Sequence, residues 1–115
     1  MEKKVEISIL CQIYGKLLTE KQYDFIDDYY NNDLSLSEIA ENNGITRQAV
    51  RDNIKKGENK LFEYEEKLRI MNKTLLQEKK IAVILSEITE IKRQSSDKEV
   101  AKILEHIKAE LNCLV

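Results

Sequence analysis

The sequence predicts an all-α protein. Its 115 residues include no proline and only three glycines, and 35% of them are charged, a composition that favours helices. Apolar residues recur every three or four positions along most of the chain, and no alternating pattern is long enough for a sheet. At 13.5 kDa, the chain is long enough for one compact domain, or for a small head with a helical extension.

Two helices are expected in the first thirty residues. An apolar stripe predicts the first helix: Val5, Ile9, Ile13 and Leu17 recur every fourth residue, with Leu10, Tyr14 and Leu18 beside them. Thr19, with Gln22 three residues later, is a capping box that opens the second helix. The residues expected to face inward from the second helix are Tyr23, Ile26 and Tyr30. The cluster at 31–33, Asn-Asn-Asp, ends it.

The next segment, LSLSEIAENNGITRQAVRDNI from Leu34, has the spacing of a helix-turn-helix. Ser35 and Glu38 form a capping box for its first helix, and Thr46 can cap its second helix through the hydroxyl. Gly44 supplies the positive φ that a tight turn between them requires. We therefore expect a helix-turn-helix motif at 35–57, which forms a head of three helices together with the second helix. With the first helix included, this region covers 1–60.

The second helix of this motif has two different faces. At about 100° per residue, four polar side chains fall within an arc of about 100° and four packing residues within about 60°. The polar residues are Arg47, Gln48, Arg51 and Lys55, and the packing residues are Val50, Ile54, Gly57 and Leu61. In a major groove, Arg and Gln can read base edges, while Lys55 and Lys56 suit phosphate. A merely solvated surface is the alternative, which the turn upstream disfavours.

An elongated helical region is expected at 61–115. A narrow apolar seam with 3-4-3-4 spacing opens it, consisting of Leu61, Tyr64, Leu68, Met71 and Leu75. A further apolar face follows up to Gln94, and Ser96 with Glu99 is a capping box for a last helix. Such a surface requires a partner. The last helix either folds back as a hairpin or pairs with a second copy, and we favour a homodimer with the seam as its interface.

The net charge of −2 argues against a strongly basic nucleic-acid binder. Its distribution is uneven, because segment 20–45 carries −6 and segment 46–60 carries +3. Contact with phosphate would therefore be local. Cys11 and Cys113 lie far apart in the sequence and are expected to be buried fillers in a reducing compartment.

Other classes of function find little support in the sequence. No apolar run reaches the length of a membrane span and no signal peptide is visible, so we expect a cytoplasmic protein without membrane insertion. His106 is the only histidine and has no metal-ligand cluster around it, and no catalytic constellation can be assembled. We expect no metal, no cofactor and no enzymatic activity.

Five blocks of the segment from Leu17 to Leu68 are the most specific: LTEKQ from Leu18, LSLSEIAE from Leu34, TRQAV from Thr46, DNIK from Asp52 and EYEEKL from Glu63. In these blocks the segment resembles the YlxM family of small bacterial proteins, whose head is similar to the promoter-reading C-terminal domain of sigma factors. Arg47, Gln48, Asn53 and Lys55 match the family's recognition helix. Arg51 stands where an aromatic residue is usual, and Asn43 where an apolar residue is preferred.

The resemblance implies a cytoplasmic, all-helical and dimeric protein encoded beside the targeting GTPase of the signal recognition particle. We expect an accessory or regulatory factor of that pathway, with the particle's RNA as ligand and its proteins as further candidate partners. The candidate nucleic-acid-binding residues are Thr46, Arg47, Gln48, Arg51, Asn53, Lys55 and Lys56. Two alternatives stay open: a dimeric regulator that reads duplex DNA, and a protein-interaction module that binds no nucleic acid.

Overall fold

The computed structural model describes residues 1–114, and these contain six α-helices, one short 3-10 helix and no strand. The all-α prediction is confirmed. In chain order, the elements are α1 (Lys3–Tyr14), η1 (Gly15–Leu17), α2 (Glu20–Tyr30), α3 (Leu36–Asn43), α4 (Arg47–Leu68), α5 (Ile70–Gln94) and α6 (Lys98–Asn112).

The chain divides into two compact units, Met1–Met71 and a second that begins at Asn72. The sequence placed the end of the head at residue 60. The structure places it later, because Leu61 is fully buried in the first unit and Tyr64 and Met71 pack against the same core. What looked like the start of an extension is therefore partly head.

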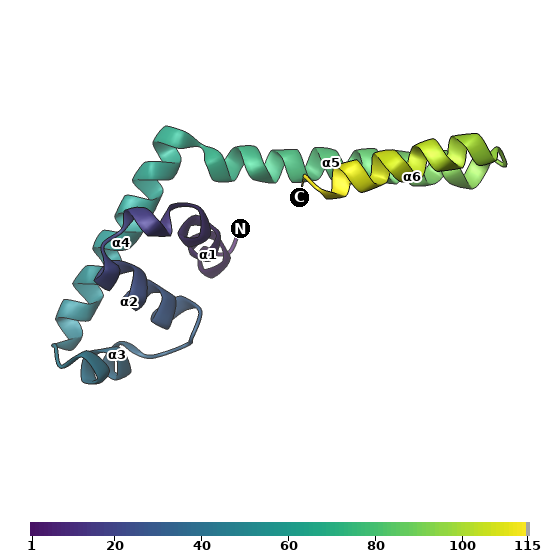
Figure 1. Ribbon diagram of the computed structural model, residues 1–115. Helices are drawn as coiled ribbons and strands as arrows, with labels where there is room; N and C mark the ends of the chain where they lie inside the picture. The colour runs from purple at the N-terminus through teal and green to yellow at the C-terminus, as the bar shows by residue number, and fades with distance from the viewer. Residues whose placement is uncertain (115) are drawn as a thin grey trace. The chain divides into compact units, whose positions relative to one another are not determined.

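In the first unit, α1, α2 and α3 gather against α4 (Figure 1). The packing residues predicted for α4 are confirmed, since all four are buried: Val50, Ile54, Gly57 and Leu61. Gly57 allows a close approach to α2, because a Cβ at this position would lie 2.5 Å from Ile26 Cδ1 and 3.3 Å from Gln22 Cβ. The rotation of α4 about its axis is thus fixed by contacts with the three shorter helices.

The apolar stripe predicted for the first helix is confirmed in part: Leu10, Tyr14 and Leu18 are buried, but the row from Val5 to Leu17 is not the core face. The buried residues of this helix are Ile7, Leu10, Cys11 and Tyr14, whereas Val5 is 46% exposed and Leu17 is 56% exposed. Both stripes have helical spacing, so periodicity alone does not choose between them. The observed stripe places Tyr14 beside α4, and the helix gives way to η1 before Leu17.

In α2, Ile26 is buried as predicted and Tyr30 is half-buried, but Tyr23 is exposed and Phe25 is buried in its place. Tyr23 lies over Gly15, where a Cβ would come within 2.8 Å of its ring. The capping box of this helix is confirmed: Thr19 Oγ1 accepts a hydrogen bond from the Gln22 amide at 3.2 Å, and Gln22 Oε1 accepts one from the Thr19 amide at 3.1 Å.

A buried hydrogen-bonded cluster holds the end of α4 to α1. The Tyr14 hydroxyl donates to Glu65 Oε1 at 2.7 Å and accepts from the Ile70 amide at 3.2 Å. The same Glu65 oxygen accepts from the Met71 amide at 3.0 Å. Arg69, between the two helices, adopts a left-handed conformation with φ of 57°. The cluster therefore satisfies the first amides of α5 where α4 stops.

In the second unit, α6 runs back along α5 as an antiparallel hairpin (Figure 1). Lys92 of α5 pairs with Glu105 of α6, and this ion pair lowers the pKa of the Glu105 carboxyl. The predicted capping box at Ser96 is wrong. The N-cap of α6 is Asp97, whose carboxylate accepts from the Glu99 amide at 2.9 Å. Within residues 1–114, no helix combines the length and apolar character needed to cross a bilayer.

We predict that Tyr14→Phe lowers the free energy of unfolding by about 1–3 kcal/mol, because it removes one buried donor from Glu65 and the acceptor of the Ile70 amide. Urea unfolding followed by circular dichroism would measure the change. Tyr23→Phe is the matched control, expected within about 0.5 kcal/mol of the unmodified chain because Tyr23 is exposed. Equal stability of both variants would contradict a structural role for this cluster.

We also predict that only one of the two cysteines reacts with a thiol reagent in the folded protein at pH 8. Burial, followed by the charge of Asp27, raises the pKa of Cys11 to about 11, which leaves about one thiolate in a thousand at that pH. Cys113 is exposed, which corrects the expectation that both are buried. Mass spectrometry after labelling should find Cys113 modified, and Cys11 only after denaturation. Rapid labelling of Cys11 in the folded chain would contradict its placement.

Candidate nucleic-acid interface

Local signals in the sequence build the turn between α3 and α4. Ser35 and Glu38 exchange the two hydrogen bonds of a capping box, each 3.1 Å long. Gly44 ends α3 with φ of 63°, and the Ile45 amide then donates to the Ala40 carbonyl at 3.1 Å. Thr46 caps α4 by accepting from the Ala49 amide at 3.1 Å. These predictions are confirmed, and together they define a helix-turn-helix.

The polar face predicted for α4 is exposed in the structure. Its members are Arg47, Gln48, Arg51 and Lys55. Gln48 Nε2 donates to Asp52 Oδ1 at 2.9 Å, so the amide leans toward a carboxylate at the border of this face. Because Val50 and Ile54 are buried on the other side, the helix presents this face outward without losing its packing.

The remaining candidate residues are placed differently. Thr46 is exposed, with its oxygen engaged as the cap of α4. Asn53 is half-buried and donates to the Ala49 carbonyl at 2.9 Å, so its amide serves its own helix. Lys56 is exposed but lies about 140° around the helix from Arg51. The structure thus brings together four of the seven candidates on one face.

A hollow of about 320 Å³ lies beside this face. Four helices contribute to its lining, which consists of Lys3, Tyr29, Tyr30, Leu36, Arg51, Ile54, Lys55 and Glu58. The rings of Tyr29 and Tyr30 meet edge to face, with centroids 5.0 Å apart, and Tyr29 is 38% exposed. The hollow therefore combines an accessible aromatic ring with cationic side chains.

Glu58 organises the wall of this hollow. Its carboxylate accepts a hydrogen bond from the Tyr30 hydroxyl, and Lys3 Nζ lies 3.3 Å from its other oxygen. Burial, and then the hydrogen bond to Glu58, raise the pKa of the Tyr30 phenol, so Tyr30 stays a donor at neutral pH. With its negative charge paired to Lys3, Glu58 opposes an anionic ligand less than a free carboxylate would.

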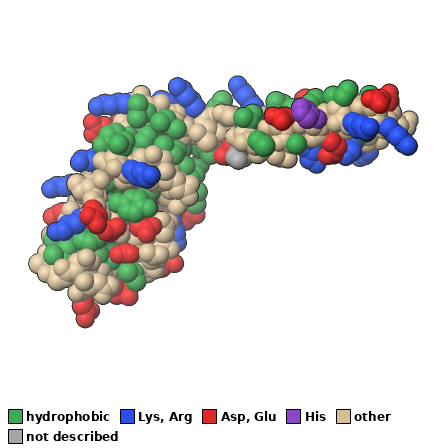
Figure 2. All heavy atoms as spheres, in the orientation of Figure 1, with side chains coloured by type: hydrophobic (Ala, Val, Ile, Leu, Met, Phe, Trp, Pro, Cys, Tyr) green, Lys and Arg blue, Asp and Glu red, His purple; other side chains and the backbone are tan. Residues whose placement is uncertain are grey.

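Sequence reasoning missed Lys3 and Tyr29 as parts of this site. They lie on α1 and α2, and only the packing of these helices on α4 brings them beside Arg51 and Lys55. Periodicity could have indicated that Tyr29 is exposed, but not what it faces. Basic and acidic side chains are interspersed on the face of the first unit seen in Figure 2, in agreement with a local contact rather than a broad basic surface.

The seam predicted as an interface between copies is corrected at Leu61, which is fully buried in its own chain. Tyr64 and Met71 are half-buried and pack against the same core, and the Tyr64 ring lies 5.9 Å from that of Tyr14. Leu68 is exposed and Leu75 half-buried, so for these two the contact stays a prediction. The seam mainly completes the head.

Within residues 1–114, no group of three or more His, Cys, Asp or Glu side chains is arranged to hold a metal ion. His106 Nε2 lies 3.8 Å from Glu110 Oε1 on the exposed surface of α6.

Comparison with known proteins agrees with this geometry. The family described as "Putative helix-turn-helix protein, YlxM / p13 like", UPF0122, matches residues 1–108. A UPF0122 protein of Acetivibrio thermocellus is 43% identical over 115 residues, which are 100% of this chain and 98% of the relative. Those of Fusobacterium nucleatum and Clostridium botulinum are 42% and 48% identical, over 93% and 86% of this chain and 97% and 90% of the relatives.

The fold and the turn define a helix-turn-helix protein. The chain belongs to the UPF0122 family, the YlxM-like proteins that the sequence blocks indicated.

Proposed function

We propose that this protein is a cytoplasmic accessory or regulatory factor of the signal recognition particle pathway that binds the particle's RNA through α4. The single observation that carries the nucleic-acid part is the face of Arg47, Gln48, Arg51 and Lys55, which is exposed on a helix held by its opposite side. The pathway itself is proposed from the resemblance to the YlxM family. The particle's proteins are further candidate partners.

The chemistry of this face suits both base edges and phosphates. Arg47 and Arg51 can donate to guanine O6 and N7, and Lys55 can contact phosphate oxygens. Thr46 caps the N-terminus of α4, where the first amides of the helix carry partial positive charge. The Asp52 carboxylate beside this face limits the number of phosphates that can approach. We therefore expect about three to five phosphate contacts and salt-sensitive binding.

RNA is favoured over duplex DNA by the hollow beside α4. The major groove of an RNA helix is too deep and narrow for a recognition helix, so specific binding to RNA uses bulges and loops whose bases are unstacked. Tyr29 offers an exposed ring on which such a base could stack, and Arg51 and Lys55 stand beside it. The proposed target is thus an unpaired nucleotide next to a short duplex.

A regulator that reads duplex DNA is the second candidate. It is favoured by the first turn of α4, where Arg47 and Gln48 are side chains suited to guanine and adenine in a DNA major groove. A role without nucleic acid is the third possibility, and it would leave the protein's other surfaces as the binding sites. Titration against RNA and DNA separates all three.

We predict that Arg47→Ala combined with Arg51→Ala abolishes most of the RNA affinity. Fluorescence anisotropy with labelled signal recognition particle RNA and with a random DNA duplex would measure it. For the unmodified protein, affinity should fall by about 20- to 100-fold between 50 and 200 mM salt. Lys16→Ala with Lys21→Ala is the control, because it removes the same charge from the same unit, outside α4. RNA binding that does not change with salt concentration and is retained by the double variant would reject the proposal. Tighter binding to the DNA duplex than to the RNA would favour the DNA regulator.

We predict that Tyr29→Ala weakens binding to a bulged or looped RNA by about 5- to 150-fold, the usual range for loss of one stacked base, with little effect on a fully paired RNA. Tyr29→Phe keeps the ring and should bind like the unmodified protein. The measurement is the same titration with paired and bulged versions of one hairpin. If Tyr29→Ala and Tyr29→Phe behave alike, the hollow does not take a base.

A further inference from the structure

The hairpin of the second unit buries few of its apolar side chains. Of residues 72–114, only Ile81, Ile88 and Leu104 are buried hydrophobic residues. Seven large apolar residues are between 39% and 62% exposed: Leu76, Val83, Ile84 and Ile91 on α5, and Ile103, Ile107 and Leu114 in and just after α6. Figure 2 shows hydrophobic side chains at the surface of this hairpin among charged ones. Exposed apolar residues mark an interaction site when they gather on one face, so their placement around the two helices matters.

These exposed residues share one face of the hairpin. Measured at about 100° per residue from Ile81, which faces α6, the four on α5 lie about 60° to 160° to one side. Measured from Leu104, which is buried on α6, Ile107 and Ile103 lie about 60° and 100° to the same side. Because the two helices are antiparallel, equal rotations place both sets on the same face.

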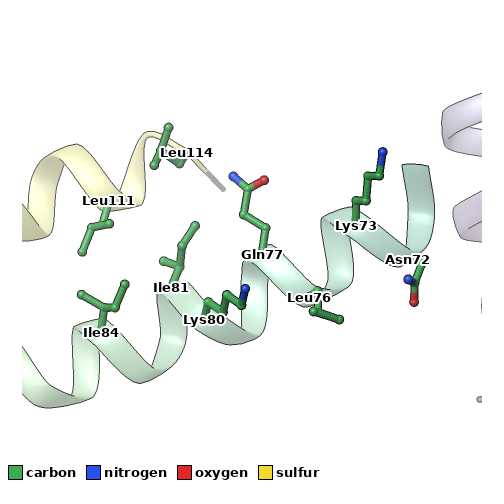
Figure 3. Close-up of a pocket in the computed structure, with 9 residues that line it drawn as sticks. All are labelled: Asn72, Lys73, Leu76, Gln77, Lys80, Ile81, Ile84, Leu111 and Leu114. Carbon is green, nitrogen blue, oxygen red and sulfur yellow. The ribbon is translucent and has the colours of Figure 1, made fainter. Parts of the chain in front are cut away.

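This face is hollowed rather than convex. A groove of about 480 Å³ is lined by Leu76, Ile81 and Ile84 of α5 together with Leu111 of α6 and Leu114 just after it, and Figure 3 shows Leu111 pointing toward α5. A second hollow of about 360 Å³ continues along α5, lined by Lys79, Lys80, Val83, Ile84 and Glu87. Both hollows have mainly apolar walls, so a partner with protruding apolar side chains fits them.

The exposed stripe of α5 is self-complementary when reversed. Its members, in order, are Leu76, Lys80, Val83, Ile84, Glu87 and Ile91, and all lie within about 100° of arc. If two copies of α5 lie antiparallel with their midpoint between residues 83 and 84, Leu76 meets Ile91, Val83 meets Ile84, and Lys80 meets Glu87 of the partner. A two-fold axis repeats each pair, as an isologous interface requires.

We propose that this face binds a second copy of the same chain, with the two α5 helices antiparallel in this register. The four helices of the two hairpins then bury the apolar stripe of α5 that each hairpin alone leaves in water. The hairpin carries nearly equal numbers of basic and acidic residues, so overall repulsion does not oppose self-association. This interface lies on another face than the seam predicted around Leu61, and it does not depend on the nucleic-acid ligand.

Sedimentation equilibrium of the full chain tests the proposal, with circular dichroism to confirm that each variant is folded. For the unmodified chain we expect twice the monomer mass of 13.5 kDa. Val83→Asp should give a monomer. Val83 is the residue of the stripe that points most directly away from α6, so this change leaves the contact between α5 and α6 intact. Lys80→Glu and Glu87→Lys should each raise the dimer dissociation constant by about 10- to 30-fold, because each creates two like-charge contacts. The variant with both Lys80→Glu and Glu87→Lys should return the dissociation constant to that of the unmodified chain. Lys102→Glu, on another face of α6, is the control.

A monomer at every concentration, or a dimer unaffected by Val83→Asp, would overturn the proposed surface. A dimer that Val83→Asp breaks but that neither single charge reversal weakens, or that the double variant fails to restore, would overturn the antiparallel register. Because no nucleic acid is present, these results are independent of whether the RNA proposal holds.

Discussion

The packing of α4 against α1, α2 and α3 is the constraint on which the rest of the head depends. Val50, Ile54 and Leu61 anchor this helix in the core, and Gly57 lets Ile26 approach it closely. A helix fixed along one side has no freedom to rotate, so the outward direction of Arg47 and Arg51 follows from apolar contacts on the opposite side. Polar residues on the outer face can therefore differ between relatives without disturbing the scaffold.

The parts of the fold that the sequence predicted well are those decided by residues close together in the chain. The capping boxes at Thr19 and Ser35, the cap at Thr46 and the turn at Gly44 each involve partners three to five positions apart. The two faces of α4 were also predictable, because its charged and apolar residues separate cleanly at helical spacing. A single segment contains all the information needed for these features.

The features that the sequence did not predict depend on contacts between distant segments. The true end of the head depends on the contact between Tyr14 and Glu65, which are 51 positions apart. Arg69 adopts a left-handed conformation without being glycine, so no turn signal marks the break after α4. Residues of four helices line the hollow beside α4, and its two tyrosines reach it only because α2 packs against α4.

The bond between Tyr14 and Glu65 also bears on the order in which the protein can fold while it is being made. A growing chain emerges with its N-terminus first, so α1 must wait for the end of α4 before its tyrosine finds a partner. The helix-turn-helix motif at 35–57 emerges before Leu61, Glu65 and Met71, which complete the core. A nascent chain that already contains the polar face of α4 therefore still lacks the segment that closes its core.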